Sequence, residues 1–279
     1  MKNKKVSYCA QAIVTGAGSG IGRAFALELH RRGGRVVCSD IDLEKAQDTA
    51  NTIIAAGGKA LAVSCDVAKL DQVQSLANTA RDWFHGPVSV LINNAGVGIG
   101  GQNIEDISIE DWHWVMEINL WGVIHGCNVF LPELKANHFG GIINVASAAS
   151  FGAAPKMGAY NTTKSAVVAL SETMHAEAAG SGVHVSVLCP TLVKTDVIKN
   201  ARMQESGNGT LMEKSRAQSL MDRFGHTPES VVIKSLDGLD KNRVHVLPQL
   251  DARIAWFMKR MTPGNFVRLN GFMASQFQS

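Results

Sequence analysis

The sequence has little of what marks a nucleic-acid partner or a membrane anchor. Its formal net charge at pH 7 is only +3 over 279 residues, and the basic start at Lys2, Lys4 and Lys5 is short. Nucleic-acid-binding chains usually carry a basic patch or stripe, so no such partner is expected. No stretch reaches the ~20 apolar residues that cross a bilayer, and no apolar core of signal-peptide length precedes Gly16. We therefore expect a cytoplasmic protein.

Cysteines are also few and scattered. Five occur, at Cys9, Cys38, Cys65, Cys127 and Cys189, mostly within apolar runs. The sequence contains no C-x-x-C pair and no Cys/His spacing typical of zinc ligands, and its histidines show no ligand spacing. Reduced, buried thiols and no metal site are predicted.

Short apolar runs alternate with longer amphipathic segments. The apolar runs, predicted as strands, are residues 12–15, 35–39, 59–64, 88–92, 141–145, 183–188 and 243–247. The predicted helices are residues 21–32, 43–56, 69–84, 109–130 and 159–179. Strands without polar alternation, separated by helices, predict a parallel sheet covered on both faces. We expect residues 1–279 to form a single α/β domain, a doubly wound Rossmann-type sheet with a C-terminal helical extension.

A glycine-rich turn follows the first predicted strand. Gly16, Gly18, Gly20 and Gly22 have the spacing G-x-x-x-G-x-G; in G-x-G-x-x-G the third glycine would fall on Ile21. Glycine permits positive φ and lets a phosphate approach the amides at a helix N-terminus. Between a strand and a helix, this turn predicts nucleotide binding.

The second predicted strand ends at Asp40, 18 residues after Gly22. An acid here can hydrogen-bond the ribose hydroxyls and would repel a 2′-phosphate. Positions 19 and 41 hold Ser19 and Ile41 rather than a basic residue. Asp42 suits the N-cap of the next helix better, which leaves Asp40 free. NAD(H) is therefore predicted over NADP(H).

Tyr160 and Lys164 stand four residues apart in a helical pattern and so share one helix face. A nearby ammonium favours the phenolate and is expected to lower a pKa that is ordinarily about 10. Such a tyrosine can exchange a proton near neutral pH. The pair alone is equally compatible with a helix face that has no chemistry.

Five motifs in order resemble the short-chain dehydrogenase/reductase family. They are T-G-A-G-S-G-I-G at 15–22, N-N-A-G at 93–96, Asn119, Ser147, and Y-N-T-T-K at 160–164. The resemblance covers residues 8–196. Ser147 precedes Tyr160 by 13 residues, as the family's catalytic serine does, whereas the competing Ser150 has the wrong spacing.

The resemblance implies four catalytic residues. Tyr160 would exchange a proton with the substrate oxygen, and Ser147 would donate a hydrogen bond to that oxygen. Lys164 would lower the tyrosine pKa and bond the nicotinamide ribose. Asn119 would interrupt its helix and hold a water of a proton relay; the alternative is an interior amide satisfied by backbone.

The edge positions and the resemblance together give the predicted cofactor site. Its residues are Gly16, Ser19, Gly20, Ile21, Gly22, Asp40, Asp66, Val67, Asn93, Ala95, Gly96, Tyr160, Lys164, Pro190, Val193 and Thr195. One departure stands out: the family usually has Pro-Gly where this chain has Pro190-Thr191. With a β-branched residue at this bend, the sequence does not determine the local pocket shape.

Residues 197–227 are predicted to fold over the substrate. They carry Met203, Leu211, Met212, Met221 and Phe224, and the tentative pocket wall adds Val97, Ile99, Ala149, Phe151, Met157 and Leu192. Adaptable apolar side chains suit a secondary alcohol or ketone with an apolar body. Packing of these side chains on the domain itself is the alternative.

The tail, residues 250–279, is basic and amphipathic. Trp256, Phe257 and Met261 alternate with Arg253, Lys259 and Arg260. It could lie on a membrane surface, cover the substrate entrance or dock on a neighbouring subunit, and packing on the protein is favoured.

The leading hypothesis is an NAD(H)-dependent alcohol dehydrogenase or ketone reductase. One alternative is a reductase of acyl-thioester-linked ketones. Another is a non-catalytic nucleotide-binding or sensing protein, because a fold does not fix a function; a sensor need not keep all four catalytic residues. By resemblance, a homo-oligomer (tetramer or dimer) would form through the helices that hold Asn119 and Tyr160.

Overall fold

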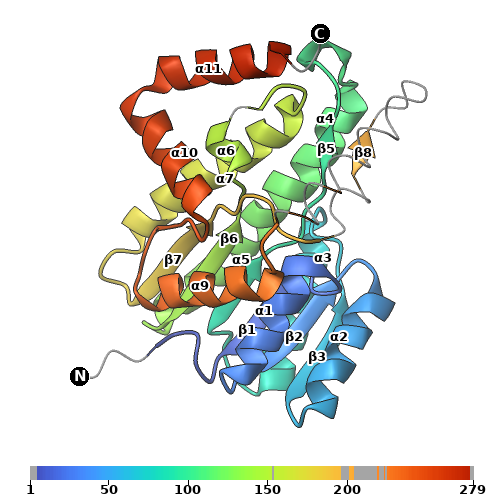
Figure 1. Ribbon diagram of the computed structural model, residues 1–279. Coiled ribbons are helices and arrows are strands. Elements are labelled where there is room, and N and C mark those ends of the chain that lie inside the picture. Colours follow the sequence, from blue (N-terminus) through green and yellow to red (C-terminus); the bar gives the residue numbers. More distant parts are fainter. Residues whose placement is uncertain are drawn as a thin grey trace.

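The computed structural model describes residues 5–152, 154–195, 201–203, 219, 223 and 225–276. Seven parallel strands form one sheet in the order β3-β2-β1-β4-β6-β7-β9 (Figure 1). These strands are β1 Gln11–Thr15, β2 Arg35–Asp40, β3 Lys59–Ser64, β4 Val90–Asn93, β6 Gly140–Val145, β7 Val183–Leu188 and β9 His245–Val246. A separate parallel pair joins β5 Ile99–Gly100 to β8 Arg202–Met203.

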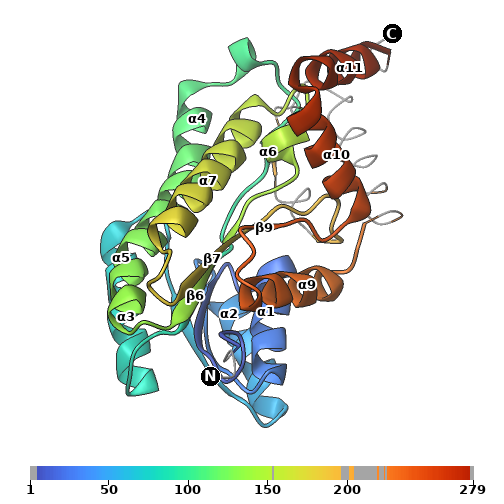
Figure 2. The ribbon, with the colours of Figure 1, turned by 90° about the vertical axis from the view of Figure 1, so that its left-hand side faces the viewer.

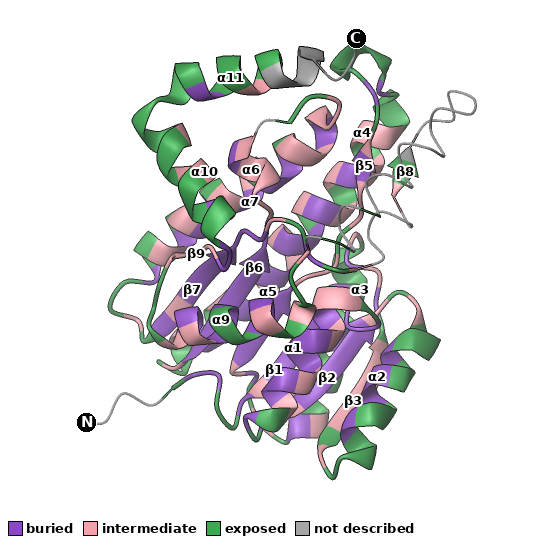
Figure 3. Ribbon diagram, in the orientation of Figure 1, coloured by how far each residue is buried: buried purple, intermediate pink, exposed green. Residues whose placement is uncertain are grey.

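Helices cover both faces of the sheet, which confirms the doubly wound prediction (Figure 2). One layer consists of α1 Gly20–Arg31, α2 Leu43–Ala55 and α9 Pro228–Asp240. The other consists of α3 Leu70–Phe84, α5 Gly122–Ala136 and α7 Gly158–Glu177. The central strands are buried throughout (Figure 3), which explains their nearly continuous apolar sequences.

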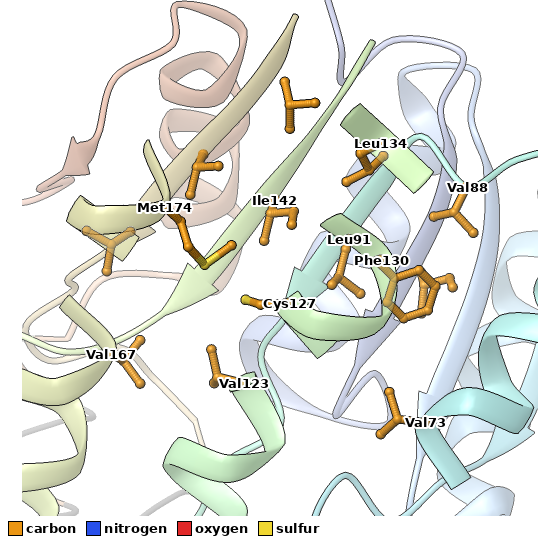
Figure 4. Close-up of a cluster of buried hydrophobic side chains, with 14 of the residues drawn as sticks. Val73, Val88, Leu91, Val123, Cys127, Phe130, Leu134, Ile142, Val167 and Met174 are labelled. Carbon is orange, nitrogen blue, oxygen red and sulfur yellow. The ribbon is translucent and has the colours of Figure 1, made fainter. Parts of the chain in front are cut away.

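The core between the sheet and the helices is formed by apolar side chains whose sequence spacing places them on the inner face of each helix. Val123, Cys127 and Phe130 are buried on one face of α5, and they lie beside Leu91 and Ile142 of the sheet (Figure 4). Their spacing of four and three residues is the helical repeat that places side chains on one face. Each large apolar side chain buried in this way contributes about 1.5–3 kcal/mol.

The predicted helix 109–130 is divided in the structure. It runs as α4 Ile109–Met116, a π-helical turn η2 Glu117–Trp121, and α5. Asn119 lies in the π turn, so the interruption implied by the family resemblance is present. The last predicted strand, 243–247, is shorter than expected because only β9 pairs with β7.

A buried ion network ties the start of the domain to α9. The Arg32 side chain is 6% exposed and donates to Glu28 and Asp237, each at 2.9 Å. It also donates to the Ser7 hydroxyl at 2.9 Å, and Ser7 in turn donates to Asp240 at 2.8 Å. Three carboxylates and a hydroxyl surround one buried guanidinium. Loss of Arg32 would therefore leave buried carboxylates without a positively charged partner.

The C-terminal extension forms two helices, α10 Leu250–Met261 and α11 Pro263–Gln276, which follow α9 and lie near α6 Ala149–Gly152 (Figure 1). Ala252 is fully buried and Trp256 packs against the main core, while Phe257 stays 60% exposed. Among the described residues no helix combines the length and the apolar character that a membrane crossing requires. Four cysteines are buried as predicted, but Cys9 is exposed.

Candidate active site

A cavity of about 510 Å³ opens at the carboxyl ends of the central strands. It lies where the chain order reverses, because β1 has β2 on one side and β4 on the other. Such a switch point is where doubly wound sheets bind their ligands. Most predicted cofactor residues line it: Gly16, Ser19, Gly20, Ile21, Asp40, Asp66, Val67, Ala95, Gly96, Tyr160, Lys164, Pro190, Val193 and Thr195.

The glycine turn needs its glycines for two different reasons. Gly16 and Gly20 have φ of +63° and +51°, in the left-handed region. At Gly22 an added Cβ would stand 2.0 Å from the Gly16 carbonyl oxygen, so only glycine lets α1 approach the turn. Ser19 precedes α1 without a side-chain cap. A phosphate fits this arrangement of close backbone and helix N-terminus.

Both carboxylate oxygens of Asp40 are held by backbone amides. One accepts from Gly18 at 2.9 Å and the other from Asp42 at 3.0 Å, which fixes the side chain at the cavity wall. Asp42 caps α2 by accepting from the Lys45 amide, as predicted. Its other oxygen pairs with the Lys45 ammonium at 2.8 Å. Lys45 also lines the cavity, although sequence reasoning did not place it there. Its position three residues after Asp42, on the first turn of α2, is the sequence signal that could have indicated it.

Ser147, Tyr160 and Lys164 converge on one wall of the cavity. Ser147 follows β6, and the other two lie one turn apart on α7. Lys164 is 4% exposed; its ammonium donates to the Val145 carbonyl at 3.0 Å and stands 5.7 Å from the centre of the Tyr160 ring. The helix spacing therefore brings phenol and ammonium to the same place.

Burial dominates the proton equilibria of this pair. It raises the pKa of Tyr160, partly opposed by a hydrogen bond with Ser147, and it lowers the pKa of Lys164 to about 8. The predicted lowering of the tyrosine pKa by Lys164 is therefore wrong for this structure. Removing water disfavours both phenolate and ammonium, so burial moves the two pKa values in these directions.

Asn119 does not line the cavity but holds the backbone of Val97, which does. Its oxygen accepts from the Val97 amide at 2.8 Å, and its nitrogen donates to the Val97 carbonyl at 2.9 Å. The side chain is fully buried, so the structure matches the alternative of an amide satisfied by backbone. Gly96 lies between it and Lys164: a Cβ there would stand 3.1 Å from Asn119 Oδ1 and 3.4 Å from Lys164 Nζ. The relay role stays a prediction.

The two asparagines of N-N-A-G have different roles. Asn93 lies in the interior, where it donates to Asn144 at 2.9 Å, and Asn144 donates to Ser171 at 3.0 Å. Asn94, which sequence reasoning did not single out, lines the cavity. Its side chain donates to the Thr15 and Gly16 carbonyls at 2.9 and 3.1 Å, and so fixes the start of the glycine turn.

The tentative substrate residues other than Val97 lie outside the described cavity wall. Ile99 and Phe151 are buried in hydrophobic clusters, and Leu192 is 41% exposed. Ala149 and Met157 are half-buried, also away from the wall. The side chains of Met203, Leu211, Met212, Met221 and Phe224, on which the predicted substrate segment 197–227 depends, lie outside the described residues.

Val97 of the predicted pocket wall does line the cavity, together with two apolar residues that the sequence did not single out, Trp114 and Ile118. Trp114 and Ile118 are one helical turn apart across the junction of α4 and η2, just before Asn119. That spacing placed them on one face, but the sequence did not show which face the cavity would take.

Family membership follows from a direct match. A family model described as short chain dehydrogenase matches residues 10–206. The chain belongs to this family. Members are oxidoreductases, and a nicotinamide dinucleotide is the class of cofactor that this membership supports.

Several relatives of this short-chain dehydrogenase are similar over most of its length. SadH of Mycobacterium tuberculosis (strain ATCC 25618 / H37Rv) is 30% identical over 261 residues, 92% of each chain. Cyclohexanol dehydrogenase of Acinetobacter sp. (strain SE19) is 35% identical, over 67% of this chain and 74% of its own. EphD of M. tuberculosis (strain ATCC 25618 / H37Rv) is 36% identical over 195 residues, 70% of this chain; the match spans only 33% of that longer relative.

Solved structures give the same fold. A short-chain dehydrogenase/reductase from Burkholderia phymatum, in complex with NAD, has a TM-score of 0.83 at 32% identity, over 90% of this chain and 92% of its own. An alcohol dehydrogenase from Thermococcus sibiricus, complexed with 5-hydroxy-NADP, has a TM-score of 0.71 at 25% identity, over 85% and 94%. The two solved relatives therefore carry different dinucleotides.

Proposed function

We propose that this short-chain dehydrogenase transfers a hydride between NAD(H) and a secondary alcohol or ketone with an apolar body. The observation that carries the proposal is the convergence of Ser147, Tyr160 and Lys164 on one wall of a cavity whose far end holds Asp40. Hydride transfer needs a proton donor and a dinucleotide cradle in one site, and the residues that line this cavity are of types suited to both roles.

NAD(H) is the proposed cofactor because of the chemistry at Asp40. Its carboxylate is oriented by the amides of Gly18 and Asp42 and would accept hydrogen bonds from the ribose hydroxyls. The nearest cation on the cavity wall, Lys45, is engaged by Asp42 at 2.8 Å. A 2′-phosphate would therefore meet an oriented carboxylate before it met a free ammonium.

When bound, the cofactor supplies or accepts the hydride, and the remaining chemistry belongs to the protein. Because burial raises its pKa, the phenol of Tyr160 is held as an acid that can donate its proton to a developing alkoxide. Ser147 donates a second hydrogen bond to the same oxygen. Lys164, beneath them, holds positive charge that favours the phenolate left after proton transfer. This protonation state suits ketone reduction.

An apolar substrate body is proposed from the wall beside these groups. Val97, Trp114 and Ile118 supply apolar surface there. The similarity to a cyclohexanol dehydrogenase, at 35% identity, supports the same substrate class. A panel of cyclic, long-chain and charged secondary alcohols with their ketones tests this. Turnover of small or charged members alone would reject the apolar class.

Two variants test the mechanism and the cofactor choice. Tyr160→Phe should abolish turnover while NADH fluorescence titration still detects binding, because only the transferable proton is lost. Surviving turnover would reject the role of Tyr160. Asp40→Asn should narrow the preference for NADH over NADPH; a wild-type enzyme that prefers NADPH would reject the role of Asp40.

We also propose a homo-oligomer built on the outer surface of α4, α5 and α7. Trp121 is 50% exposed there, next to a hollow lined by Trp112, Met116 and His125. Trp112 and Met116 are half-buried beside it, and aromatic and methionine side chains gathered on one accessible surface are typical of protein interfaces. The hollow lies on α4, η2 and the start of α5, the segment that holds Asn119.

A further inference from the structure

The C-terminal extension contacts three chain segments that carry or flank Ser147, Tyr160 and Lys164. It reaches the bend after β7 through the start of α10, and it reaches α6, just beyond Ser147, through α11. It also reaches α7 through Arg260, which donates to Glu172 at 3.1 Å. Ser147, Tyr160 and Thr191, which line the cavity, belong to or adjoin these three segments, so a single element is bonded to all three segments.

The bend contact centres on Thr191, the residue that stands where the family usually has glycine. Its backbone amide donates to Gln249 Oε1 at 3.3 Å, and its hydroxyl donates to Asp251 Oδ1 at 3.2 Å. Glycine could not make the second bond. Gln249 is 1% exposed and precedes α10, and Asp251 lies in its first turn. The departure from the family pattern is thus used to join the cavity wall to the extension.

The same bend also holds the serine segment. The Pro190 carbonyl accepts from the Ala148 amide at 2.9 Å, next to Ser147. At the other end of this segment, the Gly152 carbonyl accepts from the Asn270 side chain of α11. The segment 147–152 is therefore bonded to the extension directly at Gly152. Near Ser147 it is bonded indirectly, through Pro190 and Thr191.

We infer that the extension is a positioning element for Ser147, and that Thr191 is the positioning residue through which α10 acts. This inference rests on the proposed oxidoreductase function for its kinetic consequence, but its structural consequence does not depend on turnover. Ser147 must stand within hydrogen-bond reach of a substrate oxygen, and displacements near 1 Å in such geometry can lower rates by about a hundredfold. Loss of one exposed hydroxyl bond should permit a smaller displacement.

Paired variants at Thr191 test the hydroxyl bond. Thr191→Val keeps the shape and removes the hydroxyl, whereas Thr191→Ser keeps the hydroxyl. We expect Thr191→Val to slow ketone reduction in single turnovers about tenfold, with the Kd for NADH changed less than about twofold, and Thr191→Ser to stay near wild type. Equal rates for wild type and Thr191→Val, or equal losses in both variants, would overturn the role of the hydroxyl.

Amide hydrogen exchange provides the readout that is independent of activity. Without cofactor, residues 147–152 should exchange faster in Thr191→Val and in Asp251→Ala than in wild type, while Asp251→Asn, which keeps the acceptor oxygen, should restore protection. Ile254→Ala, on an exposed position of the same helix, is the matched control and should change neither readout. Unchanged exchange in both bond-breaking variants would refute the positioning role even if the proposed reaction proves correct. Faster exchange with no detectable turnover in wild type would reject the proposed function alone.

Discussion

The buried Lys164 should lower the stability of the folded protein. Its ammonium is 4% exposed and, among the described residues, donates to the Val145 carbonyl at 3.0 Å. Burial lowers its pKa from 10.5 to about 8, and at about 1.4 kcal/mol per pKa unit this costs the folded state about 3 kcal/mol at neutral pH. Lys164→Met removes that cost and forgoes one hydrogen bond worth about 1 kcal/mol. We expect a net gain of about 2 kcal/mol in unfolding free energy at pH 7.

The sign of the pH dependence follows from proton binding. Below pH 8 both states hold the proton, so the folded wild type bears the full cost. Between pH 8 and 10.5 the unfolded state binds more protons than the folded state, so wild-type stability rises relative to the variant. Near pH 10.5 the advantage of Lys164→Met should vanish or reverse by about 1 kcal/mol, because the neutral lysine keeps its hydrogen bond.

Urea unfolding without cofactor, followed by far-UV circular dichroism at pH 7 and 10, measures this difference. Lys59→Met, at an exposed strand position, is the control and should lie within about 0.5 kcal/mol of wild type at both values. Lys164→Met should have no ketone reductase activity. A lower unfolding free energy for Lys164→Met at pH 7, or a difference that does not change with pH, would refute this reasoning.

Three other substitutions have defined outcomes. Arg32→Met should lower the unfolding free energy by about 3–5 kcal/mol in urea titrations, because it leaves the buried carboxylate of Glu28 and its neighbours without a cationic partner. A loss below about 1 kcal/mol would contradict this. Asn119→Ala should cost about 2 kcal/mol by unpairing the Val97 amide and carbonyl, and should lower kcat/KM; unchanged stability and kinetics would contradict it. Trp121→Glu should shift the light-scattering mass toward the monomer, whereas an unchanged oligomer would place the interface elsewhere.

The sheet could be predicted because its signal is local. Each buried strand carries a continuous apolar run, and each glycine or asparagine motif falls at a strand end, where parallel topology brings it to one edge. Asp42 at the N-cap of α2 and the interruption at Asn119 followed from local pattern and family resemblance in the same way.

The remaining features depend on burial, which the sequence does not state. The spacing of Tyr160 and Lys164 predicted that they lie close together. The direction of the shift in the tyrosine pKa, however, depends on how much water burial removes from the phenol. Phe151 was assigned to the pocket for its apolar character, yet the same character places it in the core. The bond between Thr191 and Asp251 joins positions 60 apart, which no local pattern could reveal.

Hydride transfer itself is tested most directly with deuterium. NADH labelled with deuterium at both C4 positions should transfer one deuterium to the carbinol carbon of the product when the enzyme reduces a cyclic ketone, and mass spectrometry should find the alcohol one mass unit heavier than with unlabelled NADH. The Tyr160→Phe enzyme should form no product. An alcohol without deuterium, or labelled product from Tyr160→Phe at the wild-type rate, would contradict direct hydride transfer at this site with Tyr160 as the proton donor.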